Sequence, residues 1–367
     1  MKFACTQENL SRGLTTVGHI TSKNTSLPIL SNILLKAGGG TIQLAATNLE
    51  IGITSRIRGK VVEEGVCTIP GKVFSDYVSL LDESTLTLEQ SGTDLLIRND
   101  RGDTKLHGLP AEDFPLIPTI HQENKHSCPA PALREAISQV IFAAAYDDAR
   151  PEISGVLLKL AEKELTLVAT DSYRLAEKHV SLSEKTSHEV SAIVPVRALQ
   201  ELLRVLSQEG GDVSIFLTEN QILFTVGDTE LVSRLIDGQY PNYEQIVPVS
   251  HTTQATINTN DLVKAVRATS LFSRPGINDL TVTLEPKNKK IVLQAANNQV
   301  GENHREITAD IDGDENTIVF NGRYLLDGLT NLRDENTVFQ MTNNASPGVF
   351  RPAGSPGYLY IVMPIKQ

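Results

Sequence analysis

The sequence predicts an α+β protein of three tandem domains, each with two helices packed on antiparallel β-sheet. Two observations carry this prediction: similar segments recur at nearly constant offsets, and each copy repeats one order of helical and alternating patterns. At about 100–200 residues per domain, 367 residues suffice for two to four domains. We expect the domains at residues 1–125, 126–251 and 252–367, joined by the polar stretches 121–131 and 248–256.

The first recurring segment follows an alternating apolar run. It reads A-A-T-N-L-E-I-G-I at 45–53, V-A-T-D-S-Y-R-L-A at 168–176 and Q-A-A-N-N-Q-V-G-E at 294–302. The offsets are 123 residues from Thr47 to Thr170 and 127 residues from Thr170 to Asn297. A fixed period of this kind indicates repeated structural units.

Other segments keep the same register. Pro70, Pro195 and Asn321, which open three similar apolar stretches, are spaced by 125 and 126 residues. Pro115 and Pro241, in D-F-P-L-I-P and Q-Y-P-N-Y, are also 126 residues apart. Agreement among independent pairs therefore favours three copies over coincidence.

Each copy should begin with one helix and carry a second helix in its middle. Apolar residues recur at helical spacing, as in Leu133, Ile137 and Val140, and Thr259 or Asn260 would cap the third helix. Alternating strands with Gly- or Asn-containing turns fill the remainder, and G-G-G at 38–40 reads as a hairpin turn. The expected helices are 6–23, 71–81, 131–146, 196–208, 260–274 and 322–333.

Charge is distributed unevenly in this acidic chain, whose net charge is −11. The six expected helices hold eleven basic and six acidic residues, a net charge of +5, which leaves −16 for the rest. This skew favours a helical surface that meets a polyanion. Few aromatic residues accompany the cations, so a sequence-independent phosphate contact fits better than base stacking.

Composition excludes several classes of protein. No apolar run approaches the ~20 residues of a membrane span, and the N-terminus lacks a signal-peptide core, so we expect a cytoplasmic location. Cys5, Cys67 and Cys128 are odd in number and lack C-x-x-C spacing, which favours buried apolar thiols over disulfides or zinc ligands. We expect no cofactor and no metal.

The cluster Asp171-Ser172-Tyr173-Arg174 raises the question of catalysis. A hydrolase that uses Asp171 and Ser172 is one alternative, but no His is suitably placed and the other copies have Asn48-Leu49 and Asn298-Gln299. Asp147 and Asp148 are a poor metal pair, because adjacent residues of an extended segment point to opposite faces. A repeat scaffold without DNA is a second alternative, but it gives no reason for cationic helices.

The whole chain resembles the β sliding clamp of bacterial DNA polymerase III. The resemblance rests on the order and spacing of L-P-I-L-S-N-I-L-L (27–35), A-T-D-S-Y-R-L-A (169–176), L-I-D-G-Q-Y-P-N-Y (235–243) and Y-L-Y-I-V-M-P-I (358–365). It implies a non-catalytic protein whose two copies join head to tail into a ring of six domains. Helices would line the hole around double-stranded DNA, while the ring tethers the replicative polymerase, the clamp loader and repair proteins.

The resemblance also implies a groove that receives short linear motifs of these partners. One wall would be formed by Ile153, Thr170, Ser172, Tyr173, Arg174, Leu175, Pro241, Gln245 and Ile246. The other would be formed by Ile277, Asn321, Tyr324, Ala345, Pro347, Ile361, Val362, Met363 and Pro364. The family usually has Gly-His in place of Ser172-Tyr173, Arg in place of Gln245 and M-P-M-R-L at the end, so the preferred peptide should differ here.

Two further sets of residues follow from the resemblance. Leu106 in the first domain and Leu271 with Phe272 in the third would form the dimer seam. The DNA-facing cations would be Lys23, Lys72, Arg197 and Arg204.

Overall fold

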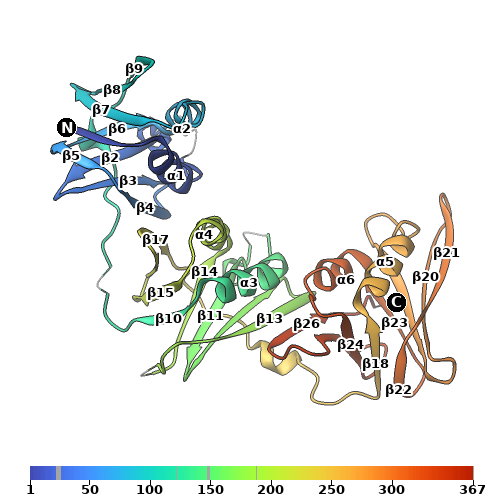
Figure 1. Cartoon of the computed structure of the whole chain (residues 1–367). Helices are drawn as coiled ribbons and strands as arrows, with labels where there is room; N and C mark the ends of the chain where they lie inside the picture. The colour runs from blue at the N-terminus through green and yellow to red at the C-terminus, as the bar shows by residue number, and fades with distance from the viewer. Residues whose placement is uncertain (22–25, 121, 147–148, 187, 367) are drawn as a thin grey trace. The chain divides into compact units, whose positions relative to one another are not determined.

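The computed structural model describes residues 1–21, 26–120, 122–146, 149–186 and 188–366. These residues form two compact units, Met1–Arg134 with Arg197–Leu235, and Glu135–Val196 with Ile236–Gln367 (Figure 1). No helix among the described residues is long and apolar enough to cross a membrane.

The first unit contains two antiparallel sheets. The five-stranded sheet has the order β5 (Lys60–Glu63), β1 (Lys2–Thr6), β7 (Thr85–Ser91), β8 (Asp94–Asn99) and β9 (Gly102–Leu106). The eight-stranded sheet has the order β10 (His126–Pro129), β15 (Asp212–Leu217), β16 (Gln221–Val226), β17 (Thr229–Arg234), β4 (Ile51–Ile57), β3 (Thr41–Thr47), β2 (Asn32–Gly38) and β6 (Gly65–Pro70). Pairing of β17 with β4 therefore joins strands from two copies of the repeat.

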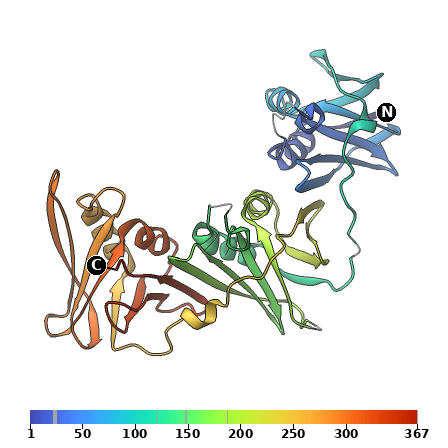
Figure 2. The same ribbon diagram turned by 180° about the vertical axis from the view of Figure 1, so that it is seen from behind.

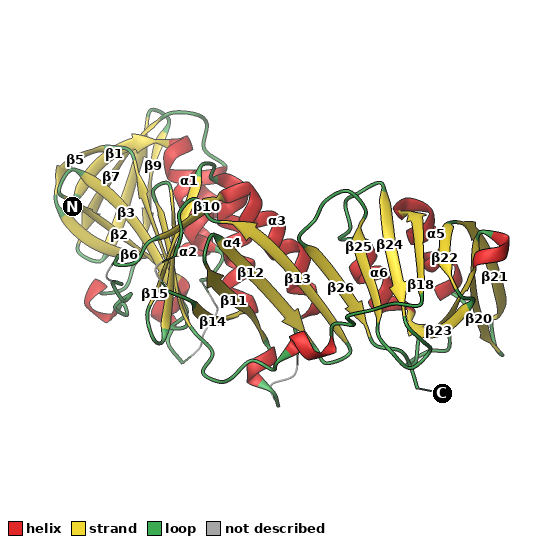
Figure 3. Cartoon of the chain, turned by 90° about the horizontal axis from the view of Figure 1, so that it is seen from below, coloured by secondary structure: helices red, strands yellow, loops and turns green. Residues whose placement is uncertain are grey.

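The second unit repeats this plan. Its nine-stranded sheet has the order β14 (Val190–Pro195), β11 (Gly155–Ala161), β12 (Glu164–Thr170), β13 (Arg174–Ser181), β26 (Tyr358–Val362), β25 (Gly348–Pro352), β24 (Asn336–Met341), β18 (Thr253–Asn258) and β22 (Asp310–Gly313) (Figure 3). Its four-stranded sheet has the order β21 (Gly301–Thr308), β20 (Lys290–Asn297), β19 (Asp279–Glu285) and β23 (Asn316–Asn321). Here β13 pairs with β26, as β4 pairs with β17.

Six α-helices lie within the described residues. They are α1 (Gln7–Gly18), α2 (Gly71–Ser79), α3 (Ala130–Val140), α4 (Val196–Gln208), α5 (Thr259–Ser270) and α6 (Gly322–Leu329). The helix α1 buries Leu10, Leu14 and Val17 and packs against α2, β3 and β4; likewise α5 packs against α6. Short 3₁₀ helices lie at Pro28–Ser31, Ala111–Asp113, Ile141–Ala143, Pro151–Ile153, Tyr243–Ile246 and Pro286–Asn288.

Most helices end earlier than the sequence predicts. Hydroxyl groups near these ends donate to main-chain carbonyls, as from Thr21 to Gly18, from Ser273 to Ser270 and from Thr330 to Leu326. Such bonds satisfy carbonyls that lack an intrahelical partner and compete with further helical turns. The predicted cap of the third domain's first helix is also wrong, because Asn258 accepts the Asp261 N–H, while Thr259 already lies in α5.

The shorter helices reduce the predicted charge skew. The observed helices hold eight basic and six acidic residues, a net charge of +2 rather than +5, so the rest of the chain carries −13. Arg274 and Arg333 lie just beyond helix ends, and Lys23 lies outside the described residues. The helices are therefore still cationic relative to the chain, but by less than the pattern indicates.

Several local predictions are confirmed. The hairpin between β2 and β3 turns at Gly39 and Gly40, whose φ angles of 57° and 75° favour glycine. All three cysteines are free and buried, and burial raises the pKa of each thiol to about 12. Asp147 and Asp148 lie outside the described residues.

Candidate functional site

The segment after β12 is a tight turn held by its own side chains. The Thr170 hydroxyl donates to the Arg174 carbonyl at 2.7 Å and accepts the Ser172 N–H at 3.1 Å. One carboxylate oxygen of Asp171, Oδ1, accepts the N–H groups of Tyr173 and Arg174, each at 3.0 Å. These bonds close the turn that starts β13, which explains why Thr and Asp stand at these positions.

The first copy of the repeat builds the same turn. The Thr47 hydroxyl donates to the Ile51 carbonyl, and Asn48 Oδ1 accepts the N–H groups of Glu50 and Ile51. Leu49 has a φ of 77° and Ser172 a φ of 76°. The cluster is thus a repeated structural turn, and Asp171 has the role that Asn48 has in the first copy.

Arg174 departs from its counterpart Ile51, because it is a buried cation with only 7% of its surface exposed. Its Nε donates to Asp171 Oδ2 at 2.9 Å, its Nη1 to Asp327 Oδ2 of α6 at 2.5 Å, and its Nη2 to the Phe142 carbonyl at 2.9 Å. The guanidinium carbon lies 4.6 Å from the Tyr324 ring centroid. Arg174 therefore joins β13 to α6, and each of its three guanidinium nitrogens donates one hydrogen bond within the chain.

Two tyrosines extend this joint toward solvent. The rings of Tyr173 and Tyr324 stack with centroids 6.4 Å apart, and 63% of Tyr173 is exposed. The Met363 N–H donates to the Tyr173 carbonyl at 2.8 Å, which continues the pairing of β13 with β26 past Val362. The C-terminal segment thus lies beside the repeated turn.

The predicted partner-binding residues divide by burial. The buried residues are Ile153, Thr170, Arg174, Leu175, Ile361 and Val362. The half-buried residues are Pro241, Asn321, Tyr324, Pro347, Met363 and Pro364. The exposed residues are Ser172, Tyr173, Gln245, Ile246, Ile277 and Ala345. The structure brings together Tyr173, Arg174, Tyr324, Val362 and Met363 through direct contacts. Asn321 caps α6 and also donates to the Ile277 carbonyl at 3.3 Å.

A charged cluster beside this surface was not anticipated from the sequence. On β13, His179 contacts Glu164 Oε1 at 2.8 Å and Glu177 Oε1 at 3.1 Å. The bond to Glu177, with that to Glu164, outweighs burial and raises the pKa of His179. Burial, then a bond to Glu177, raises the pKa of Tyr243 well above its ordinary value. Because Tyr243 lies in the segment between the second and third domains, Glu177 links this connector to β13.

The predicted seam residues lie at two sheet edges. Leu106 ends β9, the edge of the five-stranded sheet, and Leu271, which is 72% exposed, follows α5. Phe272 lies within 4 Å of the position that a Cβ on Gly301 would occupy at the start of β21. Figure 2 shows β20 and β21 as the outer hairpin of the four-stranded sheet, with β21 at the open edge. Val300, 61% exposed, adjoins this edge and was missed.

The predicted DNA-facing cations are exposed where they are described. Lys72 on α2 and Arg197 on α4 have no ion-pair partner within the described part of the chain, whereas Arg204 pairs with Glu201. Lys23 lies outside the described residues. Across the described residues, no group of three or more His, Cys, Asp or Glu side chains could hold a metal ion.

Three repeats of one α+β domain, joined by the pairing of β4 with β17 and of β13 with β26, define the class: a protein built from tandem copies of one domain. Family models for the N-terminal, central and C-terminal domains of the DNA polymerase III β subunit match residues 1–118, 128–242 and 244–366. The chain belongs to the DNA polymerase III β subunit family, the sliding clamps that confer processivity.

Known relatives match along the whole chain. The β sliding clamp of Synechococcus elongatus is 32% identical over 372 residues, covering 100% of this chain and 99% of the relative. A crystal structure of a Pseudomonas aeruginosa DNA polymerase III β sliding clamp bound to griselimycin superposes with a TM-score of 0.95 at 28% identity, covering 100% of both chains. The Bacillus subtilis clamp structure gives 0.95 at 27% identity, covering 100% and 99%.

Proposed function

We propose that two copies of this chain close head to tail into a ring of six domains around double-stranded DNA. The ring would tether the replicative polymerase, the clamp loader and repair proteins, and would itself catalyse no reaction. The proposed site of action is the cytoplasm. The observation that supports the ring is that β9 and β21 each lie at the edge of a sheet.

Within the chain, each junction between copies is a pairing of equivalent strands. The strand after the repeated turn pairs with the last strand of the next copy, as β4 with β17 and β13 with β26. In the third copy the corresponding strand is β21, and in the first copy the last strand is β9; both are edge strands. An unpaired edge offers a row of N–H and C=O groups to another chain. Pairing of β21 with β9 of a second chain would repeat the internal junctions and close the ring.

Both edges also carry apolar side chains. Their charges do not favour one pairing, because β9 holds both Asp103 and Lys105, and Lys105 and Glu306 already pair with Asp94 and Lys290. Exposed Leu271 and Val300 lie near β21, and Leu106 ends β9. Apolar burial at the centre of such an interface, with charges at its rim, favours stable association.

Contact with DNA would rest on exposed helix cations rather than on base recognition. Lys72 and Arg197 can meet phosphates, a contact that carries no sequence information and lets the protein slide. The charge of the helices, +2 within a chain of −11, is modest. Retention would therefore depend on closure of the ring rather than on tight binding.

Partner peptides would dock on the surface around Tyr173, Tyr324 and Met363. Apolar Leu175 and Val362 lie beneath it, and Met363 adapts to varied anchors. Arg174 would stabilise the residues beneath this surface, because each of its guanidinium nitrogens donates a hydrogen bond within the chain. Ser172 and Gln245, where the family usually has Gly and Arg, would change the preferred peptide at the rim.

The test is retention on DNA of different topology. After loading, the protein should stay on nicked circular DNA and be lost once a restriction enzyme linearises the circle. Equal retention on circular and linear DNA would contradict the ring. Sedimentation should give a dimer, and a monomer at micromolar concentration would contradict the seam.

A further inference from the structure

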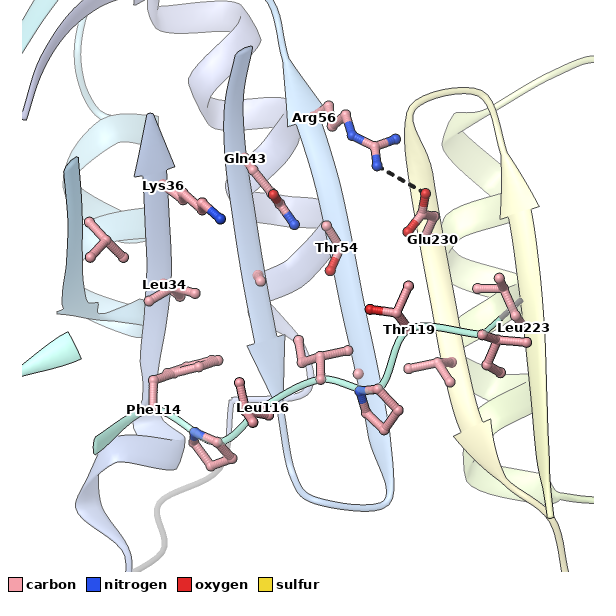
Figure 4. Close-up of a pocket in the computed structure, with 18 of the residues that line it drawn as sticks. Leu34, Lys36, Gln43, Thr54, Arg56, Phe114, Leu116, Thr119, Leu223 and Glu230 are labelled. Atoms are coloured by element: carbon pink, nitrogen blue, oxygen red, sulfur yellow. Dashed lines mark hydrogen bonds and ion pairs between the residues drawn. The ribbon is translucent and has the colours of Figure 1, made fainter. Parts of the chain in front are cut away.

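A hollow lies on the first junction between copies of the repeat, where β4 pairs with β17. It has a volume of about 540 Å³ and lies over the eight-stranded sheet beside the segment Ala111–Ile120 (Figure 4). A hollow of this size is typical of binding sites. It lies wholly within the first unit and shares no residue with the partner surface described above.

The lining of the hollow differs from the equivalent part of the second junction, where larger apolar side chains stand at the same positions. Strand registers make Ala45, Gly52 and Glu230 the counterparts of Val168, Leu175 and Leu359 at the second junction. There the three apolar side chains are buried in one cluster with Tyr243 and Val349. At the first junction Ile117 and Val232 occupy the space that a side chain on Gly52 would take, and the hollow beside them is lined by both apolar and charged groups.

The connecting segment at the first junction is held less firmly than its counterpart. At the second junction the Tyr240 hydroxyl donates to the Val168 carbonyl and Tyr243 bonds Glu177. By the spacing of Pro115 and Pro241, the counterparts are Phe114 and Ile117, which have no hydroxyl. Within the described part of the chain, no hydrogen bond between main-chain groups involves 115–120. Its carbonyl groups, and the N–H groups of its four residues other than Pro115 and Pro118, remain free for an incoming extended chain.

Polar and apolar groups occupy opposite ends of the hollow. Lys36, Gln43 and Arg56 are cross-strand neighbours on β2, β3 and β4 and form a polar row, whereas Leu34, Phe114 and Leu116 lie at the other end (Figure 4). Arg56 pairs with Glu230 at 3.1 Å, but Lys36 has no ion-pair partner among the described residues. Leu116 is 97% exposed. The lining thus combines an uncompensated cation with an exposed apolar wall.

We propose that this hollow is a second docking site, for a short extended segment of a partner protein that carries a large apolar side chain next to a carboxylate. The apolar side chain would pack against Leu34 and Leu116, and the carboxylate would face Lys36, two residues from Leu34 along β2. The main chain of the segment would run beside 115–120. The uncompensated Lys36 in a chain of net charge −11 is what favours an acidic peptide over a basic one.

Photocrosslinking to the full-length protein tests the proposal. The probe is a hexapeptide with benzoylphenylalanine flanked by leucine and two aspartates, and the comparison probe has lysines in place of the aspartates. Crosslinks of the acidic probe, mapped by mass spectrometry, should fall in 34–36 or 114–120. The lysine probe should crosslink there about tenfold less, because it would face Lys36 with like charge.

Matched variants make the test specific. Lys36→Glu should lower the crosslinking yield about tenfold, whereas Lys60→Glu, an equal charge change on exposed β5 outside the hollow, should not. Gln43→Trp should fill the hollow and abolish the crosslinks, with circular dichroism confirming that the variant folds. Crosslinks confined to the surface around Tyr173 and Met363, no crosslinks at all, or equal yields from both lysine variants would overturn the proposal.

Discussion

Replacing Arg174 by Met should destabilise the second unit by about 3 kcal/mol. Methionine keeps the apolar stem and removes the charge, so little packing is lost. The guanidinium donates three hydrogen bonds within the chain, and its removal leaves Asp171, whose side chain is only 15% exposed, without a cation. Loss of one partner of a buried ion pair typically costs about 3–5 kcal/mol.

The two carboxylates should contribute unequally. Asp327 makes the shorter bond to Arg174, at 2.5 Å against 2.9 Å, but its side chain is 48% exposed and water can replace the guanidinium. An exposed pair typically contributes about 0.2–1 kcal/mol. The coupling energy of Arg174 with Asp171 should therefore exceed that with Asp327, despite the distances.

Urea unfolding followed by circular dichroism measures both quantities, since the chain has no Trp. Arg174→Met should lower the midpoint by on the order of 1 M. Double-mutant cycles with Asp171→Asn and Asp327→Asn then separate the two couplings. An unchanged midpoint for Arg174→Met, or a larger coupling energy to Asp327 than to Asp171, would refute the argument that the buried ion pair of Arg174 with Asp171 stabilises the second unit.

Three further outcomes are expected. The pKa of His179 is raised above its ordinary value of 6.5, so protonated His179 stabilises the fold at low pH. This contribution is lost as the pH rises through the raised pKa. The urea midpoint of the wild type should therefore fall more between pH 6 and pH 9 than the midpoint of His179→Gln. Leu106→Asp should give monomers in sedimentation at micromolar concentration, because it places a charge at the seam; an intact dimer would exclude Leu106 from it. Met363→Ala should weaken a labelled partner peptide about tenfold in fluorescence anisotropy, with unchanged sedimentation.

Much of the fold could be predicted because each copy of the repeat needs the same residue types for its local hydrogen bonds. Thr47 and Thr170 make the same two hydrogen bonds in their turns, so the same residue types recur at the same offset. Helix ends could not be predicted equally well, because they depend on whether a nearby hydroxyl, such as that of Thr330, turns back onto a carbonyl. The strength of the helical charge skew was overestimated for the same reason.

The role of Arg174 was also beyond the sequence. Its partner Asp327 is 153 residues away, and no local pattern connects the two. The resemblance implies that Arg174 belongs to the partner-binding groove, which stays a prediction, and the structure adds that its guanidinium donates three hydrogen bonds inside the second unit. The hollow near Lys36 could not be predicted either, because it depends on where the segment 115–120 lies over the eight-stranded sheet, and no local pattern gives that position.

One position of the repeat links the internal junctions to the proposed dimer. Pairing across each hairpin makes Ile51, Arg174 and Val300 equivalent, since the next residues, Gly52, Leu175 and Gly301, pair with Thr47, Thr170 and Asn297. Ile51 is 3% exposed and Arg174 7%, because the following copy covers each of them, but Val300 is 61% exposed. The equivalent position is buried by the next copy of the repeat at both internal junctions. An exposed apolar residue there, Val300, therefore indicates a surface that another chain buries. A first domain supplied by a second copy, with β9 beside β21, would provide that cover in the same geometry as the two internal junctions.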